Sequence, residues 1–474
     1  MTLVARRPGT VLIFTIHRTD AWWRVVGDHL GFERAVTITD HRGHGDYNTI
    51  DAFYPAYRRF YRDATGASLE LTADEVSDVI ARCRVLRWLP ARKARAMVLA
   101  MAEAEAAVLD AVRPRVVVAF PIDRYTSDVL ARLSRKRGIP FYELTASALP
   151  KMAMLMFRGR LVAREEKAPA ALVEEKRAEI ADPLFTPSYV NNQTAYSLKR
   201  WFKVFGRFRL RGWVFRALSL WHRDPLNLHY TDAQSFLGHK PSLGDRDILT
   251  LVDEDWQERV AAFAPDRRVF VPLQLFPEAS IDYWVEDLGL VDYEAMLIEA
   301  TQALSAAGYQ VIVKDHPLQF GFRQRGLIRA LKAIPNVVMV PYDVSGNRLT
   351  DVVDTTFNLT GTLGLQSAML GRKSIVAENY YTVPGDFIEI GGRSEVGKLA
   401  EKIAATPLPA DLKSRQTRIV ANLMRGSFAA DFFSFQGFGP ESPIAPAAEL
   451  GQRLGEQIAL LGPDGEDWHR KSGL

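Results

Sequence analysis

The chain has 474 residues, of which 47% are hydrophobic and 24% are charged, a composition typical of a globular protein of two or three domains. Its 60 Lys and Arg residues nearly balance 56 Asp and Glu residues, and a formal charge of +4 excludes the generally basic surface of nucleic-acid-binding proteins. The single cysteine, Cys83, excludes a disulfide framework and a zinc site built from several cysteines.

No run of about 18 apolar residues is present, so the sequence predicts no membrane-spanning helix. The short apolar run at residues 11–14 is followed by charged residues and is typical of a strand, not of a secretory signal. We therefore expect a cytoplasmic protein.

The first third of the chain alternates apolar runs with helical patterns. The predicted elements are strands at residues 10–16, 35–39, 114–120 and 139–143, and helices at 21–30, 73–112 and 127–137. Because short buried strands separated by helices form parallel sheets, residues 1–165 predict an N-terminal α/β domain.

Residues 166–245 interrupt this alternation and are interpreted as a helical insertion or linker. Its Lys199–Arg223 stretch has eight Lys and Arg, seven Phe and Trp, and no acidic residue. Two interpretations stay open. The stretch could dock on an anionic membrane surface, or its aromatic stripe could pack on the core of the protein itself. That stripe comprises Trp201, Phe205, Phe208 and Phe215.

Alternation resumes near residue 268 and predicts a second doubly wound domain at residues 246–410, followed by a helical extension at 411–474. The predicted strands are residues 268–273, 310–314, 337–340, 355–359 and 373–377, with helices at 293–306 and 326–333. The fold class is therefore α/β, with two doubly wound Rossmann-like domains and a cleft between them.

Three segments of this second domain lie where predicted strands end, and ligands bind at that edge of open α/β sheets. In Thr360-Gly361-Thr362-Leu363-Gly364, glycines permit a close backbone approach to a ligand, and a helix N-terminus attracts phosphate. The same residues also fit a tight turn with a threonine cap.

The second segment is Lys314-Asp315-His316-Pro317, where Pro317 fixes the turn and His316 could donate to a phosphate or a sugar hydroxyl. Lys314 or Arg323 could supply positive charge, and a capping role for His316 is equally compatible. The third is Val271–Ser280, in which Gln274 ends an apolar strand and Glu278 follows in the next loop. A merely solvated Glu278 is the alternative there.

In this order the three segments resemble the capsule polysaccharide biosynthesis protein family, which contains β-Kdo transferases with a GT-B-type fold. The resemblance covers about residues 250–390 well and residues 1–165 loosely. The chain departs from the family pattern at Gln366-Ser367, where relatives carry Glu-Ala, and at Glu278, where they commonly carry Asp.

The resemblance implies a glycosyltransferase of capsule or other surface polysaccharide biosynthesis, with residues 1–165 as its acceptor-side domain. It would transfer a sugar such as Kdo from a CMP-activated donor to a lipid-linked or saccharide acceptor, at the inner face of the plasma membrane. No cofactor and no metal are implied, since the nucleotide-sugar is a substrate. Two other functions stay open: a nucleotide-sugar epimerase of the same architecture, and a non-catalytic protein of polysaccharide binding, transport or export.

Binding of the CMP moiety by partly ionised groups is expected at residues of the three segments. These are Gln274, Lys314, His316, Pro317, Thr360, Gly361, Thr362 and Gly364. A transferase also needs a carboxylate near the anomeric carbon, as base or nucleophile. The candidates are Glu143, expected to face the cleft, with Asp123 in reserve, and Glu278.

A polar loop near the N-terminus contains His41, His44 and Asp46. Their side chains could suggest a metal site, but a glycine-rich cleft loop is the stronger interpretation. Contact of His17 or Arg18 with an anionic acceptor is a further hypothesis.

Overall fold

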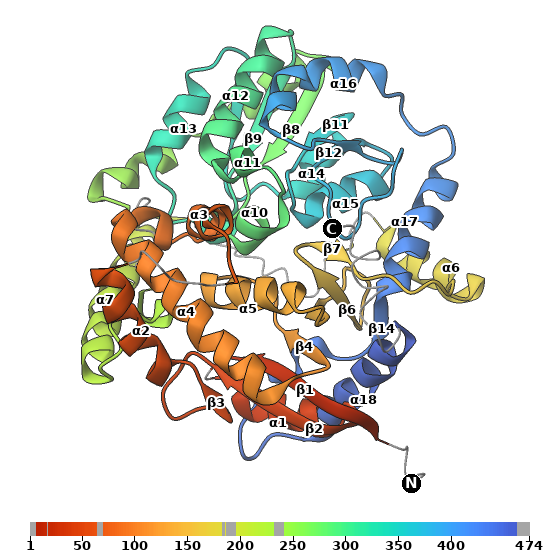
Figure 1. Cartoon of the computed structure of the whole chain (residues 1–474). Coiled ribbons are helices and arrows are strands. Elements are labelled where there is room, and N and C mark those ends of the chain that lie inside the picture. The colour runs from red at the N-terminus through yellow and green to blue at the C-terminus, as the bar shows by residue number, and fades with distance from the viewer. Residues whose placement is uncertain are drawn as a thin grey trace. The chain divides into compact units, whose positions relative to one another are not determined.

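The computed structural model describes residues 6–16, 18–63, 70–182, 185, 196–231 and 241–461, so the hypothesis for His17 lies outside the described residues. The chain forms two compact units: residues 1–169 with 421–474 (unit 1), and residues 170–420 (unit 2). Each contains a mainly parallel sheet, which confirms the predicted α/β class with two Rossmann-like domains (Figure 1). The cleft between them stays a prediction.

In unit 1, the strand order is β14-β6-β5-β4-β1-β2-β3, and β7 pairs with β6. The parallel strands are β1 (Arg7–Thr15), β2 (Phe32–Thr39), β3 (Tyr47–Asn48), β4 (Val116–Ala119) and β5 (Phe141–Ala146). The antiparallel additions are β6 (Met152–Phe157), β7 (Arg160–Leu161) and β14 (Ser427–Ala429).

The helices of unit 1 pack on this sheet and on one another. They are α1 (Asp20–Asp28), α2 (Ile50–Arg62), α3 (Ala73–Arg82), α4 (Ala91–Val112), α5 (Tyr125–Lys136) and α18 (Ala445–Leu460), with short 3-10 turns at Leu86–Trp88 and Phe432–Phe435. The single cysteine, Cys83, is buried.

The division of the chain differs from the predicted one at the C-terminus. Residues 421–474 belong to unit 1 instead of forming a separate helical extension, because β14 pairs with β6 and α18 packs against α1. The packing is close: a Cβ on Gly451 would lie 2.4 Å from the carbonyl oxygen of Val26, and one on Gly455 would lie 2.3 Å from that of Leu30. Only glycine fits these positions.

Unit 2 contains a parallel sheet with the strand order β10-β9-β8-β11-β12-β13. The strands are β8 (Arg268–Pro272), β9 (Gln310–Lys314), β10 (Val337–Val340), β11 (Thr355–Phe357), β12 (Lys373–Val376) and β13 (Ile388–Glu389). The chain reverses the direction of strand addition between β8 and β11, which makes their carboxyl ends the switch point where ligands bind in such sheets.

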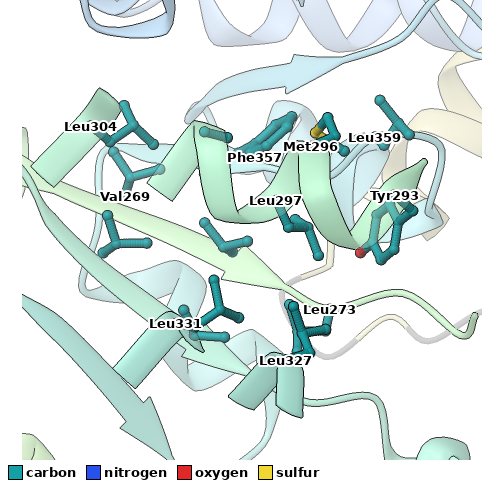
Figure 2. Packing of buried hydrophobic residues seen from close by; sticks show 14 of the residues in the cluster. Val269, Leu273, Tyr293, Met296, Leu297, Leu304, Leu327, Leu331, Phe357 and Leu359 are labelled. Carbon is teal, nitrogen blue, oxygen red and sulfur yellow. The ribbon is translucent and has the colours of Figure 1, made fainter. Parts of the chain in front are cut away.

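Helices cover both faces of this sheet because its strands are apolar on both. Val269 and Val271 face one core cluster and Phe270 faces the other, as expected for the period of two in a strand. Figure 2 shows the first cluster, in which Met296 and Leu297 of α12 (Tyr293–Ala306) and Leu327 of α13 (Arg325–Lys332) pack with Val269. The other cluster contains Trp256 and Val260 of α9 (Trp256–Ala261), and Leu349 of α14 (Gly346–Asp351).

The region predicted as an insertion or linker is instead integrated into unit 2. Trp201 is fully buried in the unit 2 core, which explains why the segment folds with it. The remaining helices are α6 (Ala170–Ile180), α7 (Leu198–Trp221), α8 (Leu228–Thr231), α10 (Ala279–Trp284), α11 (Leu288–Val291), α15 (Thr362–Met369), α16 (Leu399–Ala405) and α17 (Leu412–Gly426), with 3-10 turns at Leu243–Thr250, Pro265–Arg267, Pro317–Gln319 and Arg393–Lys398. No helix within the described residues is long and apolar enough to cross a membrane.

Candidate functional site

The carboxyl ends of β8 and β11 are joined by a reciprocal pair of hydrogen bonds at the switch point. The Gln274 amide Nε2 donates to the Thr360 hydroxyl at 2.9 Å, and the Thr360 backbone N–H donates to the Gln274 Oε1 at 3.0 Å. Both residues are buried. Gln274 thus fixes the start of the Thr360–Gly364 turn, and the predicted juxtaposition of these two segments is present.

A buried ion pair extends this connection to the end of β9. The Arg323 guanidinium contacts Asp315 Oδ1 through Nη2 at 2.9 Å, and the same nitrogen donates to the Gln274 carbonyl at 2.8 Å. Tyr342 donates its hydroxyl hydrogen to the other Asp315 oxygen. Since these partners neutralise and orient Arg323, it organises the site, and Lys314 is the remaining candidate for the positive charge that the sequence suggested.

His316 follows Asp315 and is held in one tautomer. Its Nδ1 accepts a hydrogen bond from the Leu318 backbone N–H at 3.1 Å, so the ring proton of the neutral imidazole lies on Nε2. Burial lowers the pKa of His316 to about 4. The expectation of a partly ionised group is therefore wrong for His316, which is a neutral Nε2–H donor near pH 7.

Lys314 is a buried cation whose donors are largely unused. Its Nζ makes one hydrogen bond within the described residues, to the Asp315 carbonyl at 3.3 Å, whereas an ammonium group has three donors. Burial lowers the pKa of Lys314 to about 8, so the ammonium is charged at neutral pH but poorly compensated. An anion beside it would supply the missing partner.

The first turn of α15 begins directly after Thr360 and Gly361. The backbone N–H groups of Thr362 and Leu363 come too early in the helix to reach a helical carbonyl, and this end of the helix carries partial positive charge. The turn therefore has the chemistry of a phosphate site. Pro317 is the first residue of the short 3-10 turn that follows His316.

The glycines of this turn have a different cause from the predicted one. A Cβ on Gly361 would lie 2.6 Å from Asn358 Oδ1, and one on Gly364 would lie 2.7 Å from the Tyr381 hydroxyl. Packing within the protein accounts for both glycines, so they are not in themselves signs of a ligand.

Glu278 occupies the N-cap position of α10 and is half-buried, without a capping hydrogen bond from its own side chain. Its charge acts on Tyr293, whose hydroxyl accepts from the Gln274 backbone N–H at 2.7 Å. The carboxylate therefore belongs to the same edge of the sheet, and its catalytic role stays a prediction.

Glu143 is expected to face the cleft, but its side chain is not accessible to solvent. The side chain is fully buried, and its two carboxylate oxygens accept from the backbone N–H groups of Ile122, at 3.0 Å, and Arg158, at 2.5 Å. The reason is that β5 lies between β4 and β6, inside the sheet. Burial raises the pKa of Glu143 to about 7. This geometry favours a structural carboxylate.

Asp123, the reserve candidate, is more accessible than Glu143, with 47% of its side chain exposed. Arg124 binds it in a bidentate pair at 2.9 and 3.0 Å. Partial burial acts to raise the pKa of Asp123, but Arg124 and Arg84 hold it below its usual range. It is therefore ionised and reachable, as a general base must be.

The polar loop after β2 uses its side chains internally. His41 Nδ1 lies 2.8 Å from an Asp40 oxygen, and Asp46 accepts from the Thr37 backbone N–H at 2.8 Å and pairs with Arg24 at 3.0 Å. Within the described residues, no group of three or more His, Cys, Asp or Glu side chains is arranged to hold a metal ion.

Sequence reasoning missed several residues that build the unit 2 edge: Tyr293, Tyr342, Asn358 and Tyr381. A tyrosine in an apolar segment is usually a core residue, and no local pattern shows which backbone its hydroxyl reaches. Gln366, which replaces the glutamate of the family pattern, donates from Nε2 to the Phe185 carbonyl at 3.1 Å. A glutamate could not make that bond while ionised.

Solved structures with a similar fold include two transferases of Thermosulfurimonas dismutans. The KpsC β-Kdo 2,4 transferase is 13% identical, covers 65% of this chain and 79% of its own, and has a TM-score of 0.29. The KpsC β-Kdo 2,7 transferase is 11% identical, covers 80% and 97%, and has a TM-score of 0.31.

The Neisseria meningitidis UDP-GlcNAc 2-epimerase bound to UDP-GlcNAc is 9% identical, covers 89% of this chain and 100% of its own, and has a TM-score of 0.22. TM-scores this low do not discriminate between transferase and epimerase. No curated protein matches the chain. Residues 251–385, which contain the whole unit 2 edge described above, match the capsule polysaccharide biosynthesis protein family, and this confirms the resemblance that the sequence motifs indicate.

Proposed function

We propose that the protein is a glycosyltransferase of capsule or related surface polysaccharide biosynthesis, with a CMP-activated sugar as donor. The observation that supports this most is a set of hydrogen-bond donors at the switch point of unit 2 for which the described residues provide no acceptor. His316 Nε2, the Lys314 ammonium and the first turn of α15 all belong to this edge, within the segment that matches the family. Together they suit one anionic phosphate.

The chemistry of the transfer explains why such donors matter. The bond between the anomeric carbon and the donor phosphate oxygen breaks, and its electron pair leaves with the phosphate. Donors already in place for that oxygen stabilise the charge as it develops, without reorganisation at the moment of reaction. Lys314 contributes positive charge, while neutral His316 contributes a hydrogen bond.

The acceptor hydroxyl must lose its proton as the new bond to the anomeric carbon forms. We propose Glu278 or Asp123 for this role, because each is at least partly exposed, whereas the oxygens of Glu143 are bound to backbone N–H groups. Kdo as the sugar and a lipid-linked or saccharide acceptor are proposed from the family resemblance.

Thermal unfolding with CMP, UDP and GDP tests the donor. A ligand that binds only the native state stabilises it by about 2.7 kcal/mol at a hundredfold excess over its Kd. We expect CMP to raise the Tm most, and Lys314→Met to remove most of that increase. Arg246, which is exposed in the 3-10 turn Leu243–Thr250, provides the matched control Arg246→Gln, which should respond to CMP like the wild type.

The other outcomes separate the alternatives. A larger response to UDP would favour the epimerase, and no response to any nucleotide would favour the non-catalytic protein. A CMP response without sugar transfer from CMP-Kdo would retain the nucleotide site and contradict the choice of sugar.

A further inference from the structure

Helix α7 presents two apolar faces, one of which is part of the unit 2 core. Trp201 is fully buried, and Phe208 is buried with its ring 5.1 Å from that of Phe322. Phe205 stacks on Trp201 at 4.9 Å, and Phe215 lies 5.5 Å from His229. The aromatic stripe predicted from the sequence therefore packs on the protein itself, which confirms the core-packing interpretation for these residues.

The opposite face of α7 carries apolar side chains that the protein leaves exposed. Trp213 and Trp221 are 71% and 84% exposed, and Leu210 is 65% exposed. Counted from Leu210, the residues at offsets of three, four, seven and eleven are Trp213, Val214, Ala217 and Trp221, all of which are exposed. This is the spacing of one continuous stripe along a helix.

Basic residues line both margins of this outer stripe. On a helical projection Arg207 and Arg211 fall on one side of it, and Arg209 and Arg216 on the other. All four are exposed, and α7 contains no acidic residue. Within the described part of the chain, Arg207, Arg211 and Arg216 have no ion-pair partner.

We propose that the outer face of α7, from Lys203 to Trp221, is a docking surface for an anionic lipid bilayer. Tryptophan and leucine in a stripe would enter the boundary between headgroups and acyl chains, while the flanking arginines would contact anionic headgroups. The inner face, fixed in the core of unit 2, would keep the helix parallel to the membrane surface. This proposal does not depend on the donor site or on its proposed reaction.

Charge and composition favour this occupant over two others. A second copy of the chain, related by a two-fold axis, would bring the arginine margins of both helices close together, and like charges repel. A soluble polyanion such as nucleic acid would neutralise the arginines but would leave the Leu210–Trp221 stripe in water.

Co-sedimentation with vesicles tests the proposal, using phosphatidylcholine alone or mixed with phosphatidylglycerol. We expect binding only to the anionic vesicles, weakened by raised salt. Arg207→Glu/Arg211→Glu should reduce partitioning about tenfold or more. Trp213→Gln/Trp221→Gln should reduce it similarly at both low and high salt, because the apolar contribution is not screened. Circular dichroism and Tm would verify that each variant is folded.

Matched controls change similar side chains at other exposed sites. Arg95→Glu/Arg135→Glu and Leu408→Gln/Leu460→Gln should bind anionic vesicles like the wild type. Equal binding by the controls and the α7 variants, or no binding by the wild type at low salt, would overturn the proposal. A concentration-dependent dimer that the tryptophan variant abolishes would also overturn it, in favour of a second copy of the chain. Tighter binding to single-stranded RNA than to vesicles, unchanged in the tryptophan variant, would overturn it in favour of a nucleic acid.

Discussion

Ionisable residues near the carboxyl ends of the parallel strands have different hydrogen-bond environments in the two sheets. In unit 1, both carboxylate oxygens of Glu143 accept hydrogen bonds from backbone N–H groups. In unit 2, Asp315 is similarly bound by Arg323, but Lys314 and His316 beside it have donors for which the described residues provide no acceptor. Buried polar groups whose hydrogen bonds are made within the protein stabilise the fold, whereas buried donors without an acceptor indicate a ligand site.

Paired and unpaired buried charges also affect the free energy of unfolding in different ways. Removing one partner of a buried ion pair leaves an uncompensated charge and is strongly destabilising, whereas a poorly compensated buried cation lowers stability in the intact protein. The unit 2 edge has both, so substitutions there should change stability in opposite directions.

The largest effect is expected for Asp315→Ala. Removal of the carboxylate leaves the Arg323 guanidinium buried and unpaired, and breaking a buried pair in this way costs about 3–5 kcal/mol of unfolding free energy. Asp123→Ala removes a partly exposed partner of Arg124 and should cost at most about 1 kcal/mol. Urea unfolding of both variants measures the difference, and equal losses would contradict the assigned burial of the Asp315 pair.

Lys314→Met should raise the free energy of unfolding, whereas Asp315→Ala lowers it. The pKa of Lys314 falls from 10.5 to about 8 on folding, so below pH 8 the folded protein carries a desolvated charge that the unfolded chain hydrates. Removing it should stabilise the protein by up to about 3 kcal/mol at pH 7, and the gain should shrink as pH rises above 8.

The matched control is Lys413→Met, since Lys413 is 70% exposed, and its unfolding free energy should change by less than about 0.5 kcal/mol. Loss of nucleotide binding together with a gain in stability would identify Lys314 as a ligand-binding group. A destabilised Lys314→Met variant would show that the cation is compensated within the protein.

Glu143 gives the corresponding pH test in unit 1. Its folded pKa of about 7 lies above the ordinary value of 4.5, so it favours folding at low pH, and this contribution is lost as pH rises from 4.5 through 7. Glu143→Gln cannot ionise. The stability of the wild type relative to this variant should therefore fall by about 2–3 kcal/mol between pH 5 and 8. A constant difference across that range would mean that the carboxylate is ionised throughout.

The periodicity of apolar residues predicted most of the secondary structure. The positions of Gln274, His316 and Thr360 at strand ends predicted that the three residues lie at one edge of the sheet. Each of these lies within three residues of the end of an apolar run, so a local pattern was sufficient. The same logic failed for Glu143, which also ends an apolar run but is covered by β6, a strand whose antiparallel return the sequence did not indicate.

Long-range pairing set the limit on prediction. β14 has three residues and joins β6 from the far end of the chain, so neither its length nor its neighbours reveal it. The Arg323–Asp315 pair likewise depends on how the loop after β9 folds back. Trp201 and Trp213 lie on the same helix with similar neighbours, and only tertiary packing decides that the first is buried and the second exposed.

The smallest effect, and the one most specific to the site, concerns His316 and pH. An ordinary histidine titrates near pH 6.5 and would bind phosphate more tightly as pH falls through that value. The pKa of His316 is about 4 because the ring is buried, so it remains a neutral donor throughout the range from pH 5.5 to 7.5. His316→Gln keeps an amide donor without a titrating ring. The phosphate of CMP itself gains a proton near pH 6, so the informative quantity is the difference in binding free energy between the wild type and this variant. We expect calorimetry to give the same difference at pH 5.5, 6.5 and 7.5, within about 0.3 kcal/mol, the usual limit for independent effects. A difference that grows toward low pH would mean that the bound anion protonates the ring, and His316 would then act by charge and not as a neutral hydrogen-bond donor.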